Sequence, residues 1–339
     1  MSIGWPETLP DRVLDLIRSA SFAQYTTVSA AGVPIDTPVL IFPSENLQTI
    51  NLATGLSYPA KAERARRNPR VGLLIEGGPS EPVISIAGMG AVRDSDLQGN
   101  VDRYLVEAAY SLAHDPDWSL ARQAVWYWTR IIVEITPAGV MWWDSPASMD
   151  QPPRRWDALA GTVFPGSDPP PPGKNGEAAK WEKRPWQQLA MQALEREVPG
   201  HLSVIDAEGF PRPLRAQAIA ITESGFTCDM PLGIPWKIVG KACLTFGGIE
   251  TFVGEACTLA SSRIAMQVER SLPIFPMTQD MKQLWEPTDN TREQLMRRLR
   301  EETQRRGQPI PAIALDRPPP SEGYKRRLAR RKALPRTAR

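Results

Sequence analysis

An internal repeat constrains the fold of this chain more than any other feature of its sequence. Residues 26–55 and residues 202–233 each begin with a short β-type run and a turn of the form Gly-x-Pro, which holds Gly32 in one copy and Gly209 in the other. Each copy continues with a second strand, a polar turn, a third strand and a bend. The chain is therefore predicted to contain two copies of one β-rich unit.

The repeat extends into the strands that follow. The segment VISIAGMGAVRD matches ETFVGEACTLAS, which places Gly88 opposite Gly254, and TRIIVEITP matches SRIAMQVERSLP, which places Arg130 opposite Arg263. Short strands with turn residues between them are typical of closed or partly closed barrels rather than of a parallel sheet. A glycine inside a strand often marks a bulge or a sharp bend, which we expect at Gly88.

Composition divides the chain into four regions. A stretch rich in proline and glycine separates the two copies and is expected to form a linker, partly extended and partly flexible. Helices are expected before each copy, at 10–19 and 186–197, and again at 291–307, where the letters TREQ suggest a capping box. The basic tail from Tyr324 onward is expected to be disordered. The predicted domains are residues 1–143 for the first barrel, 144–185 for the linker, 186–285 for the second barrel, and 286–339 for the C-terminal helix and basic tail.

Charge, cysteine and histidine content exclude several classes of function. The chain has 339 residues and a formal net charge of +2, so nucleic acid is not expected as a partner. Its three cysteines form no CxxC pair, which fits a reducing, cytoplasmic setting. No apolar run approaches a membrane span, and the first residues do not read as a secretory signal. The two histidines, His114 in an expected loop and His201 in an expected structural role, argue against most metal sites and against a histidine-based triad.

The bend at residues 54–61 carries the chemistry that a phosphate needs. Thr54 and Ser57 supply hydroxyl groups, Lys61 supplies an ammonium group, and a helix start supplies free backbone N–H groups. Arg64 follows Lys61 by one helical turn and is a second candidate cation. Two plainer interpretations stay open: the hydroxyl groups cap the helix, and the basic stripe at 64–70 is a solvated helix face.

The order of these motifs resembles a known family. The strands TPVLIF and TINLAT, the bend GLSYPAK, a short helix, NPRVGLL, ISIAGMGAVR and RIIVEITP are similar to the pyridoxamine 5′-phosphate oxidase-like split barrels, which bind FMN. The resemblance implies a mainly β fold with flanking helices, two split β-barrels in tandem (α+β). It also implies that Thr54, Ser57 and Lys61 hold the cofactor phosphate, and that the strand Asp36-Thr37-Pro38-Val39 lies along the flavin ring, with Thr37, Pro38 and Val39 as its candidate contacts.

The second copy departs further from this pattern. Its bend reads MPLGIPWKIVGKACL, in which Gly233 stands near the place of Ser57 and proline and glycine stop the helix. Lys237 remains as a cation, and Trp236 is expected to form a wall near the ligand. We therefore expect one phosphate site per chain, on the first barrel, with the fused tandem imitating a dimer of single barrels.

The resemblance implies an FMN-dependent oxidoreductase that acts on a small organic substrate, with reduced nicotinamide as a candidate electron donor. The compact Ser-Arg-Lys cluster of the oxidase and its C-terminal substrate pattern are missing, so pyridoxamine phosphate oxidation is not expected. The alternatives are a reductase that uses a deazaflavin coenzyme, a haem-binding or haem-degrading protein, and a non-catalytic flavin-binding protein. Homodimer formation stays open.

Overall fold

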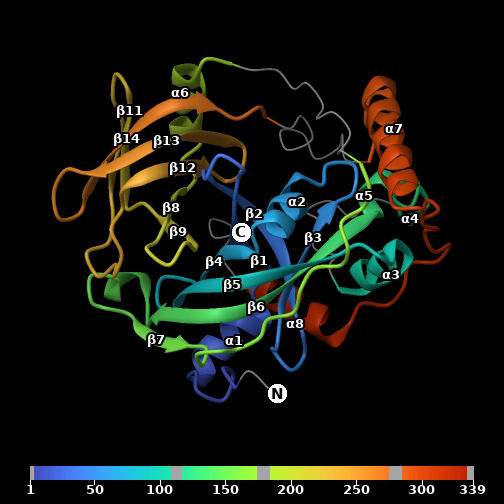
Figure 1. Ribbon diagram of the computed structural model, residues 1–339, viewed down its shortest axis with the longest axis horizontal. Helices are drawn as coiled ribbons and strands as arrows, with labels where there is room; N and C mark the ends of the chain where they lie inside the picture. The colour runs from blue at the N-terminus through green and yellow to red at the C-terminus, as the bar shows by residue number, and fades with distance from the viewer. Residues whose placement is uncertain (1–3, 108–116, 174–183, 275–284, 334–339) are drawn as a thin grey trace.

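The computed structural model describes residues 4–107, 117–173, 184–274 and 285–333 (Figure 1). His114 lies outside these ranges. The described residues form two curved antiparallel sheets that lie against each other, with helices around them. The helices are α1 (Asp11–Ser19), α2 (Ala60–Arg67), α3 (Leu97–Glu107), α4 (Trp118–Ala121), α5 (Val125–Trp128), α6 (Trp186–Glu195), α7 (Asp289–Arg305) and α8 (Glu322–Ala333), with a short 3₁₀ turn at Pro146–Ser148.

The first sheet closes into a barrel. Its strands are β1 (Phe22–Val28), β2 (Pro34–Pro43), β3 (Ile50–Gly55), β4 (Arg70–Glu76), β5 (Val83–Arg93), β6 (Arg130–Trp143) and β7 (Arg154–Asp157). They run in the order β3-β2-β1-β4-β5-β6-β7, and an additional pairing of β3 with β6 closes the ring. β7 lies within the predicted linker, so part of that segment extends the first sheet instead of only connecting two domains.

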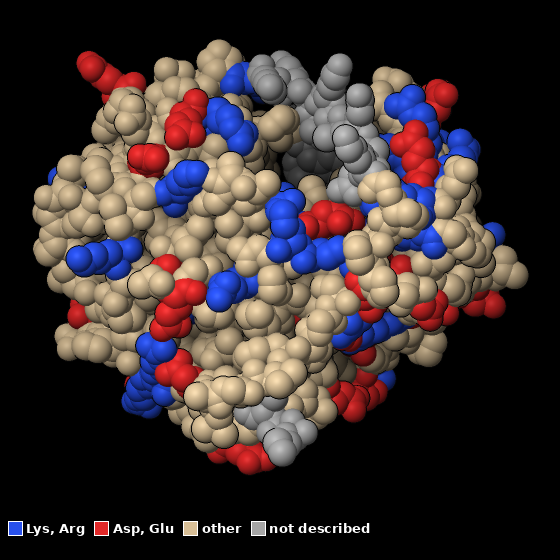
Figure 2. All heavy atoms as spheres, in the orientation of Figure 1, with Lys and Arg blue, Asp and Glu red and all other residues tan. Residues whose placement is uncertain are grey.

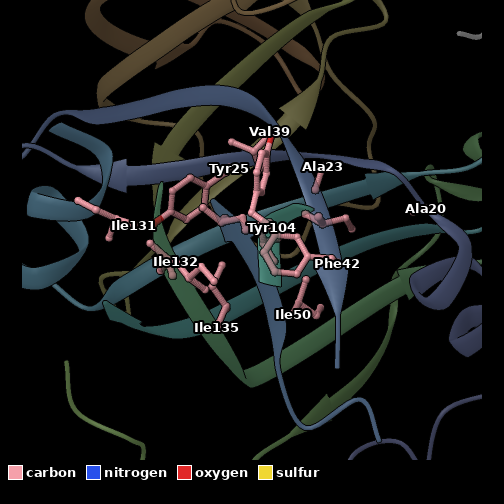
Figure 3. Packing of buried hydrophobic residues seen from close by; sticks show 14 of the residues in the cluster. Ala20, Ala23, Tyr25, Val39, Phe42, Ile50, Tyr104, Ile131, Ile132 and Ile135 are labelled. Atoms are coloured by element: carbon pink, nitrogen blue, oxygen red, sulfur yellow. The ribbon is translucent and has the colours of Figure 1, made fainter. Parts of the chain in front are cut away.

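Apolar side chains from several strands fill this barrel. Figure 3 shows Tyr25 from β1, Val39 and Phe42 from β2, and Ile132 from β6 in one close-packed group. All four are buried, as expected where one face of each strand points into a core. Four tryptophans of the first unit, Trp126, Trp128, Trp142 and Trp143, are also buried, which agrees with a packing role for them.

The second sheet repeats the strand order of the first with one interruption. Its strands are β8 (Gly200–Ile205), β9 (Pro211–Arg215), β10 (Ala218–Ile221), β11 (Gly225–Asp229), β12 (Gly240–Phe246), β13 (Glu250–Thr258) and β14 (Arg263–Ser271). The order is β10-β11-β14-β13-β12-β8-β9. β9 and β10 together correspond to β2 of the first sheet. With this correspondence the two sheets have the same strand order, but the second sheet does not close, because the strand is interrupted between Arg215 and Ala218. The prediction of two tandem barrel-like units is confirmed.

Glycines mark the same points in both units. The pairing register shifts next to Gly88 between β5 and β6, and next to Gly254 between β13 and β14, so both strands carry the predicted bulge. Gly32 and Gly209 adopt positive φ angles of 74° and 83° in the two matching hairpin turns. A side chain disfavours this conformation, which explains why the Gly-x-Pro signature identifies both turns.

An approximate twofold axis relates the two sheets. Thr26 and Ser203 occupy equivalent positions when the hairpin turns are aligned, and their hydroxyl groups hydrogen-bond to each other at 3.2 Å. Arg70 lies over the ring of Phe210 in the second hairpin turn, and Lys241, its equivalent, donates to the backbone of the first turn. Reciprocal contacts of this kind are typical of the interface of a symmetric dimer.

The C-terminal segment is ordered and packs on the first unit. α8 buries Tyr324 and Arg327, so the expectation of a disordered tail is wrong up to residue 333. Arg327 pairs with Glu107 at 3.0 Å, a contact that no local sequence pattern announces. α7 begins earlier than expected, because Thr288 rather than Thr291 caps its start.

Candidate functional site

The candidate site lies at a gap in the wall of the first barrel. β2 pairs with β3 only from Ile41 to Pro43, while residues 34–40 of β2 pair with β1. β3 continues beside β6 instead, with Gly55 opposite Arg130. The chain then bends and enters α2, which packs against β1, β5 and β6. Side chains of α2 therefore reach the gap that the splayed strands leave.

Lys61 projects from the first turn of α2 without a counter-charge. Ala62 and Ala65 anchor the helix in the barrel core, which leaves Lys61 and Arg64 together on an adjoining face. Lys61 makes no hydrogen bond or ion pair within the described parts of the chain. Burial lowers its pKa to about 8, with Arg64 and Arg130 acting in the same direction and Asp36 opposing them.

Two arginines complete a cationic cluster with Lys61. Arg64 Nε donates a hydrogen bond of 2.7 Å to Thr27 Oγ1 on β1. Arg130 is only 6% exposed, and its guanidinium lies over the rings of Tyr104 and Tyr127, 4.7 and 4.1 Å from their centres. Its Nε has no hydrogen-bond partner among the described residues. Stacking on tyrosine faces stabilises the arginine charge without neutralising it.

Tyr58 connects the bend to this cluster. Its side chain forms a hydrogen bond with Arg130, and its ring lies against Gly55, where a Cβ atom would clash with it. Gly55 is therefore required for the tight approach of the bend to β3.

Asp36 is the acid that acts electrostatically on Lys61 of the cluster. It lies on β2 opposite Thr26 and faces the second sheet, because Thr26 itself hydrogen-bonds to Ser203. The hydroxyl groups of Thr26 and Ser203 lie near its carboxylate, yet neither carboxylate oxygen completes a hydrogen bond of normal geometry with a described residue. Burial raises the pKa of Asp36 to about 6, against a smaller opposing effect of His201.

The charge balance of this region favours an anion of two charges. Lys61, Arg64 and Arg130 are three cations, and Asp36 is one carboxylate that interacts electrostatically with Lys61. A phosphate monoester carries about −1.5 to −2 charges at pH 7 and offers several strong acceptor oxygens. Figure 2 shows basic and acidic side chains gathered over α2.

The hydroxyl groups of Thr54 and Ser57, which we expected to share one ligand, have different surroundings in the structure. Thr54 is buried near the end of β3, and its hydroxyl has no partner among the described residues, so it stays a candidate ligand. Ser57 is fully buried and its hydroxyl donates to the carbonyl of Leu295 on α7 at 3.2 Å, so it is not offered to a ligand. Neither hydroxyl caps α2, whose N-cap is Pro59, and the capping interpretation is wrong.

The strand expected beside the flavin ring lies at the unpaired edge of β2. Thr37 and Pro38 are partly exposed there, and Pro38 lies against Gly248 in the turn between β12 and β13. Val39 points its side chain into the barrel core, so only its backbone faces the edge (Figure 3). The second unit therefore contributes a wall to this side of the gap, through the turn at Gly248.

The equivalent bend of the second unit is covered by the linker segment around Met149 and Gln151. Residues 230–239 contain no helix, and Gly233 donates its backbone N–H to Met149 of the linker at 2.9 Å. Trp236 stacks on Arg212, 5.3 Å from its guanidinium carbon, and belongs to the core of the second sheet. The structure thus joins Trp236 to Arg212 rather than to Lys61, and Lys237 is exposed.

Arg130 and Asp36 are the site residues that sequence reasoning missed. Arg130 stands at the start of β6 and reaches the bend only because β3 pairs with β6, a contact between distant segments. The expected match of Arg130 with Arg263 is wrong, because Gly88 pairs with Pro137 and Gly254 with Val268, which makes Ile132 the equivalent of Arg263. The basic stripe is likewise not a simple solvated face, because Arg66 is mostly buried and pairs with Asp94 at 2.7 Å.

No cluster of three or more His, Cys, Asp or Glu side chains suited to a metal ion occurs in the described ranges. His201 is buried and its Nε2 lies 2.7 Å from Glu76 Oε2. In these same ranges, no helix combines the length and the apolar character that crossing a bilayer requires.

No protein-family model and no curated protein matches the sequence. Solved structures are similar to parts of it. A pyridoxamine 5′-phosphate oxidase-related, FMN-binding protein from Nostoc punctiforme is 16% identical, covers 40% of this chain and 84% of its own, and has a TM-score of 0.31. General stress protein 26 from Bacillus anthracis is 17% identical over 43% of this chain and 96% of its own, with a TM-score of 0.29. An F420 reductase is 12% identical over 37% of this chain and 92% of its own, with a TM-score of 0.29.

Proposed function

We propose that the chain binds the phosphate of FMN at the cluster of Lys61, Arg64 and Arg130, and that it is an FMN-dependent oxidoreductase acting on a small organic molecule. One observation carries the proposal. Three cations stand together at the gap of the first barrel, and none of them forms an ion pair within the described chain. Unpaired, partly buried cations cost free energy, which a bound anion recovers.

The unsatisfied polar atoms around the gap fit a phosphate. Arg130 Nε and Thr54 Oγ1 are buried without partners in the described ranges, and the Lys61 ammonium has three free donors. Gly55, which joins Thr54 to the bend, lies opposite Arg130, so these donors approach the gap from one side. In this proposal Arg64 and Lys61 hold the phosphate from α2, and Arg130 holds it from β6.

FMN supplies hydride chemistry, so the chain itself needs no catalytic triad. The tasks left to its residues are to bind the phosphate, to orient the ring against the edge at Thr37 and Pro38, and to shield it with the turn at Gly248. A deazaflavin coenzyme also carries phosphate and is the second candidate ligand for the same cations. Turnover with reduced nicotinamide distinguishes an oxidoreductase from a non-catalytic flavin-binding protein.

Titration of FMN into the chain and into Lys61→Ala tests the cofactor site. Removing one charge-assisted contact is expected to cost about 1.5–3 kcal/mol, which is roughly a 10- to 100-fold loss of affinity. Arg67→Ala is the matched control, because Arg67 lies on the same helix, carries the same charge and is exposed. It should change the affinity by less than about threefold.

The experiment has clear contrary outcomes. Equal FMN affinities of Lys61→Ala and the unmodified chain would overturn the assignment of the phosphate to this cluster. Tight binding of a deazaflavin coenzyme without measurable FMN binding would replace FMN by the second candidate.

A further inference from the structure

A buried carboxylate, that of Asp36, lies at the junction of the two units and interacts electrostatically with Lys61 of the proposed phosphate site. Asp36 is 1% exposed, and both of its carboxylate oxygens lack a hydrogen bond of normal geometry within the described chain. A buried carboxylate without such bonds is costly when it is ionised. A position of this kind is therefore either neutral or in need of a nearby positive charge.

The groups around Asp36 come from both units. β1 contributes Thr26, whose hydroxyl is shared with Ser203 of β8. β8 also contributes His201, which pairs with Glu76 of β4. The charged and titratable groups that act on Asp36, or on which it acts, are His201, Cys243 of β12, and Lys61 of α2. Of these, Lys61 belongs to the cationic cluster at the gap.

We propose that Asp36 regulates the anion site by competing with the ligand for the charge of Lys61. The inference rests on the proposed function, since it concerns the binding of the same phosphate. When Asp36 is ionised, its charge partly satisfies Lys61 and repels an incoming dianion. When Asp36 is protonated, the three cations face the ligand alone, and the ligand binds more tightly.

The direction of the pH effect follows from linkage. Because burial raises the pKa of Asp36 to about 6, the carboxyl ionises between roughly pH 5 and pH 7 in the free protein. A bound dianion disfavours that ionisation, so affinity for a dianion falls as the pH rises through this range. If the bound dianion shifts the pKa of Asp36 upward by one unit, the affinity falls about tenfold.

Dianion affinity measured from pH 5 to pH 7.5 in the full chain and in Asp36→Asn tests this inference. FMN titrates in this range through its own phosphate, but the ratio of the two affinities cancels that contribution. Inorganic sulfate, which keeps two charges throughout, is the second probe. Asp229→Asn is the control, because it removes a partly exposed carboxylate of the second sheet that pairs with Arg263.

The expected result is a ratio near one at pH 5 that rises to about ten in favour of Asp36→Asn at pH 7.5, whereas Asp229→Asn follows the unmodified chain at every pH. If Asp36→Asn fails to fold, sulfate binding by the unmodified chain should still be accompanied by proton uptake near pH 6, measured by calorimetry in two buffers. Binding with a constant ratio, or with no proton uptake, overturns this inference and leaves the proposed function standing. Absence of FMN and sulfate binding at every pH in all folded proteins overturns both.

Discussion

Single residues at the centre of this molecule are held in environments that oppose their charge. Asp36 is buried and Lys61 is partly buried, and burial shifts the pKa of each group toward its neutral form. Arg130 keeps its charge against the faces of Tyr104 and Tyr127. A chain gains no stability from such an arrangement, so it points to a bound ligand rather than to packing.

Asp36 should make the stability of the chain depend on pH. Its pKa is raised on folding from 3.8 to about 6. The native state therefore holds this proton more tightly, and the stability it contributes below pH 4 is lost as the pH rises through 6. Asp36→Asn should thus be more stable than the unmodified chain at pH 7, by up to about 3 kcal/mol relative to their difference at pH 4.

Urea unfolding at pH 4 and pH 7 measures this difference. Asp229→Asn serves as the control, because the hydrogen bond with Arg263 lowers the pKa of Asp229, and no gain at high pH is expected. A stability difference between Asp36→Asn and the unmodified chain that is the same at both pH values would contradict the assignment of a raised pKa to Asp36.

Lys61 and Arg64 could be identified as candidate ligands from the sequence, because both lie on one short helix after a bend. It did not allow Ser57 to be judged correctly. Its hydroxyl is engaged by Leu295, a residue 238 positions away in the chain. From the sequence, Asp36 could be assigned only to a strand. Its burial could not be predicted, because it depends on contact with the second sheet. Local patterns indicate which polar side chains could bind a ligand. Tertiary contacts determine which of these side chains already hydrogen-bond within the protein.

Among the elements, α2 holds the site by being fixed on two faces. Lys61 and Arg64 face the gap, while Glu63 and Arg66 face an ion network that also involves α7 and the end of β5. In that network Arg306, just after α7, contacts Asp94 at 2.9 Å and Glu63 at 3.4 Å. The C-terminal segment thereby fixes the helix from which the proposed phosphate ligands project.

Arg306→Ala should destabilise the fold strongly. The side chains of Arg306, Asp94 and Glu302 are each 2% exposed, so removing the arginine leaves buried acids with fewer partners. The expected loss is about 3–5 kcal/mol. Arg297→Ala is the matched control, because its side chain is 66% exposed and its ion pair with Glu301 spans 4.0 Å.

Denaturant unfolding of both variants measures the difference. The control should lose less than about 1 kcal/mol, as is usual for a surface ion pair. Similar losses in the two variants would show that the network does not support α2 as described. FMN titration of the folded fraction of Arg306→Ala would then report whether α2 keeps its position without the network.

Elements formed by local signals were predictable, and their long-range partners were not. The hairpin turns, the bulges and the three predicted helices follow from glycine positions and apolar spacing. The closure of the first barrel by β3 and β6, the added strand β7 and the packing of α8 bring together distant segments. No periodicity within a short window records such contacts.

At the scale of the whole molecule, the tandem combines dimer-like symmetry with unequal sites. The hairpin turns, the bulges and the reciprocal contacts of Arg70 and Lys241 repeat in both units. The bends do not. The first bend leads into α2 and a cluster of unpaired cations, whereas the second has no helix and is covered by the linker at Gly233. The symmetry therefore holds for the scaffold but not for the candidate ligand site.

One cofactor per chain is the expected stoichiometry. A helix start offers several unpaired N–H groups to a phosphate, and the bend of the second unit has no helix. Lys237 is exposed on the second bend, with Trp236 turned onto Arg212. Flavin absorbance against protein concentration at saturation should give one FMN per chain. Lys61→Ala should lose this binding and Lys237→Ala should keep it. Two flavins per chain, or loss of binding in Lys237→Ala alone, would show instead that the second unit retains a phosphate site.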